Sequence, residues 1–323
     1  MMKLKKHLVF LLVAAALAFL PVSGQAVTID PFYAGSYTAF DLGSVPGVPP
    51  LYGPVLLKAG DPNTLLIGGN ANEASGALYS IGVTRDANNH ITGFSGSASF
   101  YAEAAYNDGG AQYGPGGVLF LARWPVNEIG QNLPGSTVTD KIVDMAALGV
   151  ANSAAALAFV PAGFPGAGQL KLVSWEGGEW YTLTYTPDGT GTFDITSANF
   201  VETLPGGPEG IAYVPPGSPL FPVPSLLQCE FSVGKVATYE VDANGDPTLA
   251  SRRDFITDLE GAEGAFIDPL TGDFLFSTFG GGDRVVVVQG FVAPPVIPLP
   301  PTVLLLGSGL LGLIGFGRKF KTT

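Results

Sequence analysis

The chain has 323 residues, of which 46% are hydrophobic and only 13% charged, and it contains 45 glycines and 27 prolines. So many turn formers exclude a fold of long helices and favour short strands joined by tight loops, that is, an all-β protein. Residues 1–26 and 296–323 hold six of the fifteen basic residues and no acidic one, which leaves nine basic against 27 acidic residues between them. A body with a net charge of −18 excludes binding to nucleic acid or anionic lipid by charge.

The chain has one cysteine, Cys229, so it forms no intramolecular disulfide. Cys229 lies in a run of alternating apolar residues, which favours a small buried side chain over a reactive thiol.

The N-terminal segment predicts export. Residues 1–26 begin with three lysines, continue with an apolar stretch from Leu8 to Leu20 and end in small residues. This pattern is typical of a cleaved secretory signal peptide, which would engage the Sec export machinery. A permanent N-terminal anchor is the alternative, although the apolar run is shorter than the roughly 20 residues that span a bilayer.

The body of the chain, residues 27–291, repeats a pattern about every 50 residues. An apolar strand opens each of five units, and in four of them a hairpin and a second strand follow directly, while the second unit is less regular at this point. A further strand follows in four units, whereas the fifth stops at Phe291 without one. Residues 36–47 show the same alternation at the other end of the chain and are expected to supply it. The five opening strands are 63–70, 117–124, 168–175, 225–232 and 272–279.

This arrangement predicts a five-bladed β-propeller closed by its N-terminal strand, because a closed ring leaves no long exposed edge. Six blades are the alternative if the long first and second units hide another. A two-sheet sandwich also uses strands at similar spacing, but the regular spacing and the closing strand favour the propeller.

A second repeat marks the innermost strands. Glu209 and Glu263 are 54 residues apart, as are Pro215 and Pro269, and Pro161 lies another 54 residues before Pro215. The stretch around residues 263–274 resembles blades of NHL and gluconolactonase-like β-propellers. In that family, inner-strand carboxylates hold a divalent metal that activates water, so the resemblance implies such a role for Glu209 and Glu263. This chain departs from the pattern at Ala155, which stands at the corresponding place in the third unit.

The remaining chemistry is limited by the scarcity of histidine. His7 lies in the signal segment and His90 in a hairpin turn, so a Ser-His-Asp or Cys-His arrangement and a zinc site of His and Cys are not expected. Glu209 and Glu263 are the candidate ligands of a hard cation such as Ca²⁺. The alternative is that both carboxylates accept hydrogen bonds from neighbouring blade loops and repeat because the blades are duplicated. No organic cofactor is expected.

Two further features have ordinary structural explanations. The GGGD stretch at 280–283 lacks the helix and the Lys and Ser/Thr of a phosphate loop, so it is expected to be a blade turn. Several aromatic residues are expected on strands, where packing between blades is a more frequent role than stacking on sugars. They are Trp124, Trp175, Trp180, Tyr181 and Tyr185.

The C-terminal segment predicts sorting at the envelope. A proline-rich linker at 292–301 is followed by a hydrophobic helix expected at 302–317 and a basic stub at 318–323 that would face the cytoplasm. At about 1.5 Å per residue this helix is short for the roughly 30 Å hydrocarbon core, which suits a transient anchor better than a permanent one.

The order of these elements resembles the PEP-CTERM sorting signal of Gram-negative bacteria. That resemblance implies processing by an exosortase, in organisms that usually make exopolysaccharide. The usual acidic residue between the prolines is absent, and a plain membrane anchor is the alternative. The motif residues are Pro298, Leu299, Pro300, Arg318 and Lys319.

Two hypotheses of function follow. The first is a non-catalytic propeller that serves as a binding scaffold, passes transiently through the inner membrane and reaches the cell surface or extracellular matrix. Extracellular polysaccharide or envelope proteins would be its partners. The second is a divalent-metal-dependent lactonase-like hydrolase on the same scaffold.

Overall fold

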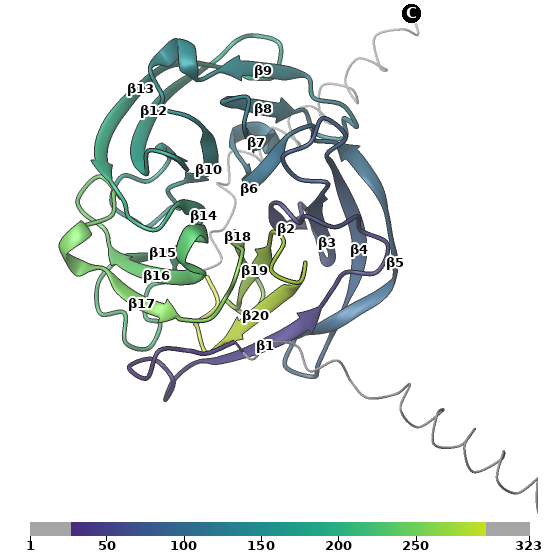
Figure 1. Cartoon of the computed structure of the whole chain (residues 1–323), viewed down its shortest axis with the longest axis vertical. Helices are drawn as coiled ribbons and strands as arrows, with labels where there is room; N and C mark the ends of the chain where they lie inside the picture. Colours follow the sequence, from purple (N-terminus) through teal and green to yellow (C-terminus); the bar gives the residue numbers. More distant parts are fainter. Residues whose placement is uncertain (1–26, 295–323) are drawn as a thin grey trace, which may run out of the picture. The chain divides into compact units, whose positions relative to one another are not determined.

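The structure, a computed structural model, describes residues 27–294 and shows a five-bladed β-propeller. Five four-stranded antiparallel sheets surround a central axis (Figure 1). Within residues 27–294 the only helical segments are four single turns of 3-10 helix, as expected from the glycine and proline content. The helical turns are Pro115–Gly117, Ala146–Leu148, Phe231–Val233 and Leu249–Ser251.

Each blade runs from an inner strand at the axis to an outer strand at the rim. Blade 1 consists of β2 Val55–Lys58, β3 Asp61–Gly69, β4 Ala77–Arg85 and β5 Ile91–Glu103. Blade 2 consists of β6 Asn107–Tyr113, β7 Leu119–Arg123, β8 Glu128–Asn132 and β9 Lys141–Asp144. Blade 3 consists of β10 Ala154–Phe159, β11 Leu170–Ser174, β12 Glu179–Pro187 and β13 Phe193–Thr203. Blade 4 consists of β14 Pro208–Val214, β15 Ser225–Glu230, β16 Lys235–Glu240 and β17 Arg253–Ile256. Blade 5 consists of β18 Ala262–Ile267, β19 Phe274–Thr278, β20 Val285–Gln289 and β1 Thr38–Gly43.

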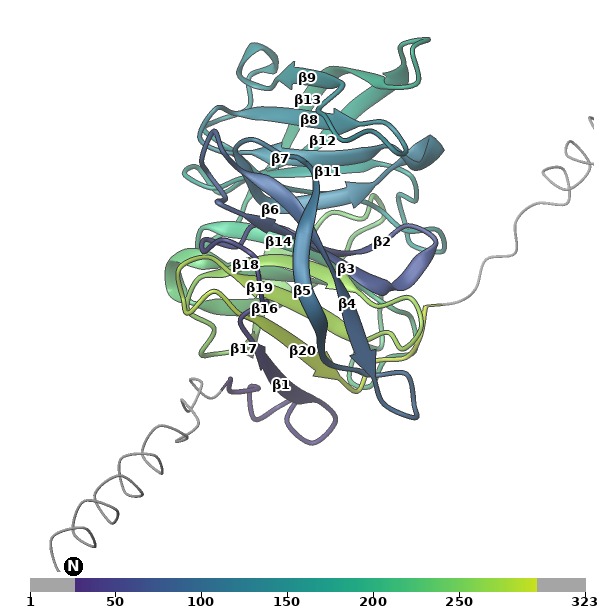
Figure 2. The same cartoon turned by 90° about the vertical axis from the view of Figure 1, so that its right-hand side faces the viewer.

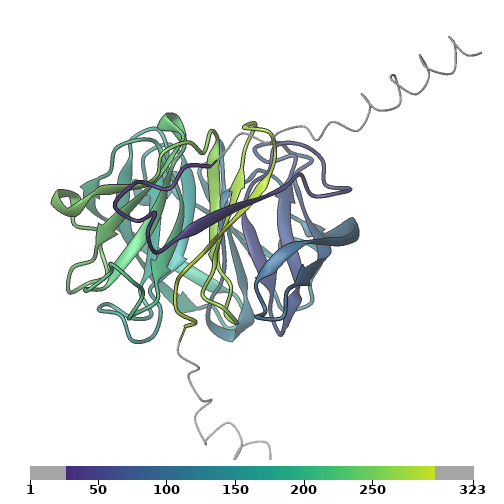
Figure 3. The ribbon, with the colours of Figure 1, turned by 90° about the horizontal axis from the view of Figure 1, so that it is seen from below.

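The predicted closing strand is confirmed, and so is the count of five blades. β1 pairs antiparallel with β20, with Ala39 opposite Val288 and Phe40 opposite Val287 (Figure 3). Tyr37 packs against Phe291 with ring centroids 4.4 Å apart, which adds an aromatic contact between the two ends of the propeller. One sheet is thus built from both ends of the chain, so the ring cannot open without breaking its ladder.

The apolar core consists of five clusters, each between two neighbouring blades. Successive residues of one strand serve different clusters: Leu56 of β2 packs toward blade 2, while Val55 and Leu57 pack toward blade 5. The strands near the axis have neighbours on both faces, and β11, for example, is buried along its whole length. Along β13 at the rim, buried residues alternate with exposed ones at first and the later residues are exposed or partly exposed. Inner strands need apolar residues on both faces and rim strands on one, which explains the two kinds of hydrophobic pattern in each repeat.

The strands β4 and β5 form a long outer hairpin in blade 1 (Figure 2). Two side chains of this hairpin connect it to blade 5. Arg85 pairs with the buried Asp268, and His90 Nδ1 lies 2.7 Å from Asp273 Oδ2. His90 therefore occupies a hairpin turn, as expected, and contacts a neighbouring blade. The GGGD stretch is the turn between β19 and β20, also as expected.

The predicted signal peptide, the sorting motif and the C-terminal helix lie outside the described residues. Among residues 27–294, no helix has the length and apolar character needed to cross a bilayer.

Candidate functional site

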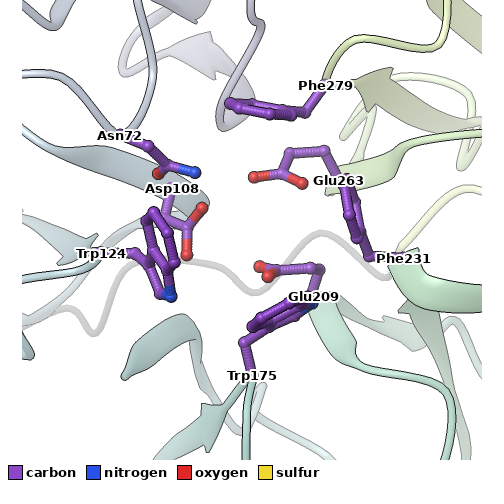
Figure 4. A pocket seen from close by; sticks show the side chains of 8 residues that line it. All are labelled: Asn72, Asp108, Trp124, Trp175, Glu209, Phe231, Glu263 and Phe279. Carbon is purple, nitrogen blue, oxygen red and sulfur yellow. The ribbon is translucent and has the colours of Figure 1, made fainter. Parts of the chain in front are cut away.

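Three inner strands carry a carboxylate followed by glycine. These are Asp108 in β6, Glu209 in β14 and Glu263 in β18. Each sits at an irregularity in the pairing of its strand with the next one, between Asn107 and Ala111, Pro208 and Ile211, and Ala262 and Ala265. A bulge of this kind re-aims a side chain, and here all three carboxylates turn toward the axis (Figure 4).

The glycine after each carboxylate allows the inner strands to approach closely. A Cβ on Gly109 would lie 2.5 Å from Glu209 Oε2, and a Cβ on Gly210 would clash with the backbone N of Ala265 and with the carbonyl of Glu263. Any larger residue would force the strands apart. The pairs Asp-Gly and Glu-Gly thus supply both the acid and the space it needs.

The three carboxylates, here called the axial carboxylates, lie together although they come from three blades. One oxygen of each can be chosen so that all three lie within 4.8 Å of one another. The residues are only 2–3% exposed, and Asp108 Oδ2, Glu209 Oε2 and Glu263 Oε1 have no hydrogen-bond partner. No ion pair found within residues 27–294 includes any of the three. Buried carboxylate oxygens without hydrogen-bond partners are costly, which indicates a site that binds a ligand.

The surroundings hold these acids toward their neutral forms. Burial raises the pKa of Asp108 to about 7, although hydrogen bonds from Glu263, Asn72 and the Gly109 backbone N–H partly oppose the shift. Burial raises the pKa of Glu209 well above its usual range, and the charge of Asp108 raises it further. Burial and then the charges of Glu209 and Asp108 do the same to the pKa of Glu263. A cation placed among them would reverse these shifts by favouring the ionised forms.

Four aromatic side chains surround the mouth of the site. In four blades the residue directly after the second strand is aromatic, and we call these residues the aromatic collar: Trp124, Trp175, Phe231 and Phe279. They contact one another edge to face in chain order, with ring centroids 6.2, 6.1 and 6.0 Å apart. Asn72, after the second strand of blade 1, completes the ring, and with its amide oriented to donate, its nitrogen lies 2.9 Å from Asp108 Oδ1.

The axial carboxylates and the collar line one pocket with a volume of about 130 Å³ (Figure 4). The strand register explains why carboxylates and collar lie together. Pro208 pairs with Glu230, so Glu209 lies beside the end of β15, and Phe231 follows directly after that strand. The carboxylates thus form the base of the pocket and the rings its walls. We call it the axial pocket.

The sequence identified two of the three acids. Glu209 and Glu263 come together at the axis, as their spacing predicted, and Ala155 occupies the apolar inner strand of blade 3. Asp108 was missed because the second unit aligns poorly with the others. Its signal was the Asp-Gly pair, which matches Glu209-Gly210 and Glu263-Gly264.

The expectation for the aromatic residues is partly wrong. Trp180 and Tyr181 lie on β12 and pack between blades. Trp124 and Trp175, however, lie just beyond β7 and β11, are half-buried and line the axial pocket. Cys229 is fully buried in β15, as expected, and burial raises the pKa of its thiol well above the usual range.

Three carboxylates fit a hard cation by their donor chemistry, since Ca²⁺ prefers oxygen ligands at 2.3–2.6 Å. Carboxylate oxygens within 4.8 Å of one another can all reach one such ion. Three carboxylates supply at most six oxygens, so water or a ligand would complete a larger coordination shell.

Neither a protein-family model nor a curated protein matches the chain. Solved structures of similar shape include a proposed oxidoreductase (glucose dehydrogenase) from Thermus thermophilus, with 11% identity, a TM-score of 0.45 and coverage of 78% of this chain and 100% of that one. An auxiliary nutrient binding protein from Bacteroides ovatus has 10% identity, a TM-score of 0.44 and coverage of 79% and 76%. The aldose sugar dehydrogenase of Streptomyces coelicolor has 15% identity, a TM-score of 0.39 and coverage of 77% and 83%. Likeness at this level shows no activity or ligand, and the propeller assignment rests on the strand order.

Proposed function

We propose that this chain is an exported, non-catalytic binding protein whose axial pocket captures a positively charged ligand. The observation that carries the proposal is the convergence of three buried carboxylates that line one pocket, each with one oxygen that lacks a hydrogen-bond partner. A cation would satisfy those oxygens and compensate their burial, whereas an anion would be repelled.

Export and sorting belong to the same proposal and rest on the ends of the sequence. The basic and apolar start supports passage through the Sec machinery, and the resemblance of residues 296–323 to a PEP-CTERM signal supports handling by an exosortase. The propeller would then act at the cell surface or in the matrix, where envelope proteins or polysaccharide would be its neighbours. Intact mass of the protein recovered from envelope and medium tests this, and a retained tail would contradict release by an exosortase.

Cation capture is tested by the thermal stability of the full chain, purified in mild detergent, in the presence of different solutes. A ligand that binds only the folded state raises the melting temperature by mass action. We expect a rise with at least one of Ca²⁺, Mg²⁺ and small ammonium ions, and none with chloride, acetate or glucose. The rise should disappear in Glu209→Gln and Glu263→Gln and persist in Glu73→Gln, which removes an exposed carboxylate one residue from Asn72. If no cation stabilises the wild type, the proposal is wrong.

A metal-dependent hydrolase of lactonase type is the second candidate. It is favoured by one observation, namely that the carboxylate oxygens face a pocket that could hold both a metal-bound water and a substrate. It requires that hydrolysis of a simple lactone depend on added divalent metal and be lost in Asp108→Asn. Binding of a cation without any such turnover would leave the binding protein as the function.

A further inference from the structure

The four rings of the collar are a built feature of the site. They occupy the same place in four of the five blades, directly after the second strand, and all four are only half-buried. Large apolar side chains gathered at one surface site mark an interaction surface more often than chance. Their position at the mouth of the axial pocket indicates that the ligand has an apolar part.

In their ionised forms the axial carboxylates supply hydrogen-bond acceptors and no donors. Asp108 Oδ2, Glu209 Oε2 and Glu263 Oε1 are each unpartnered and come from three different blades. A primary ammonium group carries three N–H donors, one for each carboxylate, whereas a quaternary ammonium carries none. Three acceptors about 2.8 Å from one nitrogen, along its tetrahedral N–H directions, are about 4.6 Å apart. That spacing falls inside the 4.8 Å limit within which one oxygen of each axial carboxylate lies.

The size of the pocket also favours an organic ion. Its volume is about 130 Å³, close to that of a cavity of about 150 Å³ that holds benzene. A bare metal ion would occupy the carboxylate base and leave the rings facing water. A cation held near the rings gains about 0.5–2 kcal/mol from cation–π interaction with them. The rings also cover the apolar carbon next to the cation.

The pocket is continued by a groove that gives a longer ligand room. Phe231 and Phe279 line both the axial pocket and an open groove of about 630 Å³ between blades 4 and 5, whose other residues include Asp258 and Glu260. A substituent that extends past these two rings would therefore leave the pocket beside carboxylates, which again disfavours an anionic ligand.

We propose that the axial pocket binds a protonated primary amine, R–NH₃⁺, with its nitrogen on Asp108, Glu209 and Glu263 and its apolar stem inside the aromatic collar. This inference rests on the proposed function, because it names the class of cation that the site takes. A free small amine and the side chain of a lysine present the same chemistry.

The experiment is calorimetric titration of the full chain in mild detergent with four solutes, three of which have related shapes. Phenethylammonium carries the proposed group, N,N,N-trimethylphenethylammonium keeps the charge without N–H donors, and 2-phenylethanol keeps the shape without the charge. CaCl₂ is the fourth. We expect one phenethylammonium per chain, bound at least about tenfold more tightly than the trimethyl ion, and no binding of the alcohol. Nα-acetyllysine methylamide, titrated in parallel, binds more tightly than phenethylammonium if the natural source is a lysine and less tightly if it is a free amine.

Variants then assign the two parts of the site. Glu263→Gln should weaken phenethylammonium binding at least about tenfold, and Trp124→Leu, which keeps an apolar side chain but removes the ring, about threefold to tenfold. Glu73→Gln should change nothing. Circular dichroism of each variant shows whether it is folded, and Phe279→Leu replaces Trp124→Leu if that variant is not.

Four results would overturn the inference. Equal binding of the alcohol would show that charge is not recognised, and unchanged affinity in the folded collar variant would show that the rings are not used. Binding of CaCl₂ at the axial carboxylates without binding of phenethylammonium would overturn the amine but leave cation capture standing. Binding of neither cation would overturn both proposals.

Discussion

The propeller contains two kinds of buried acid, and they are treated differently. Asp246, between blades 3 and 4, accepts hydrogen bonds from Lys171 Nζ at 2.5 Å and from Trp180 Nε1 at 2.8 Å. The axial carboxylates are equally buried, but they face one another and have unpartnered oxygens. The difference teaches that this fold supplies a partner for a buried acid that packs between blades. The unpartnered oxygens at the axis are therefore better explained by binding of a ligand than by a role in stabilising the fold.

Breaking the paired acid should have the largest effect. Lys171→Met leaves Asp246 without its cation in a buried place, and we expect the free energy of unfolding to fall by about 3–5 kcal/mol. Urea denaturation measures it. Lys235→Met, which removes the partly exposed partner of Asp254, is the matched control and should cost under about 1 kcal/mol. Similar losses in both variants would show that Asp246 is not a buried pair.

The axial acids should make stability depend on pH in the opposite sense to a paired acid. The folded pKa of Asp108 is raised from 3.8 to about 7, so the folded protein keeps a proton that the unfolded chain releases above about pH 4. This contribution is fully present below pH 4 and is lost as the pH rises through 7, by up to about 4 kcal/mol. Denaturation curves at pH 5 and pH 8 measure the loss. Asp108→Asn should reduce the dependence, and an unchanged slope in that variant would contradict the assignment.

The close approach at the axis should be sensitive to a single methyl group. Gly210→Ala places a Cβ against the backbone of β18, and we expect a loss of about 1–3 kcal/mol in stability together with the loss of cation binding. Gly96→Ala is unsuitable as its control, because Gly96 has a positive φ. Gly35→Ala, which meets open space, is suitable and should be nearly silent in both measurements.

Neutralising one axial acid should have the smallest effect on folding. Burial raises the pKa of Glu209 and so favours its neutral form, and glutamine has almost the same shape, so Glu209→Gln should change stability by less than about 1 kcal/mol. The same variant should lose cation binding. Loss of folding and of binding together would place Glu209 with the structural acids instead.

Much of the fold could be predicted because it depends on local and periodic signals. Apolar strands about every 50 residues, hairpin turns rich in Asn, Asp and Gly, and the missing strand after Phe291 were enough to predict five blades and the closing strand. The 54-residue spacing likewise placed Glu209 and Glu263 at equivalent inner positions.

Only part of the site could be predicted from the sequence, because its residues belong to different repeats. Asp108 lies in an irregular unit, and its Asp-Gly pair does not by itself show that it meets acids 101 and 155 residues further on. The collar shows the same limit. Trp124, Trp175 and Phe279 each end an apolar run, and Phe231 lies one residue before the end of another, which predicts strand packing as well as a pocket wall.

By itself, then, the sequence determined the repeat, the strand order and the acidity of the inner strands, because each depends on neighbours along the chain. The segments expected to direct export and sorting remain predictions of the sequence. Only the tertiary structure decided that three acids share one base and four rings one mouth, since closure of the ring brings equivalent positions of distant blades to a common axis. The physical reason is that burial, missing partners and shared space are properties of that axis and of no single blade.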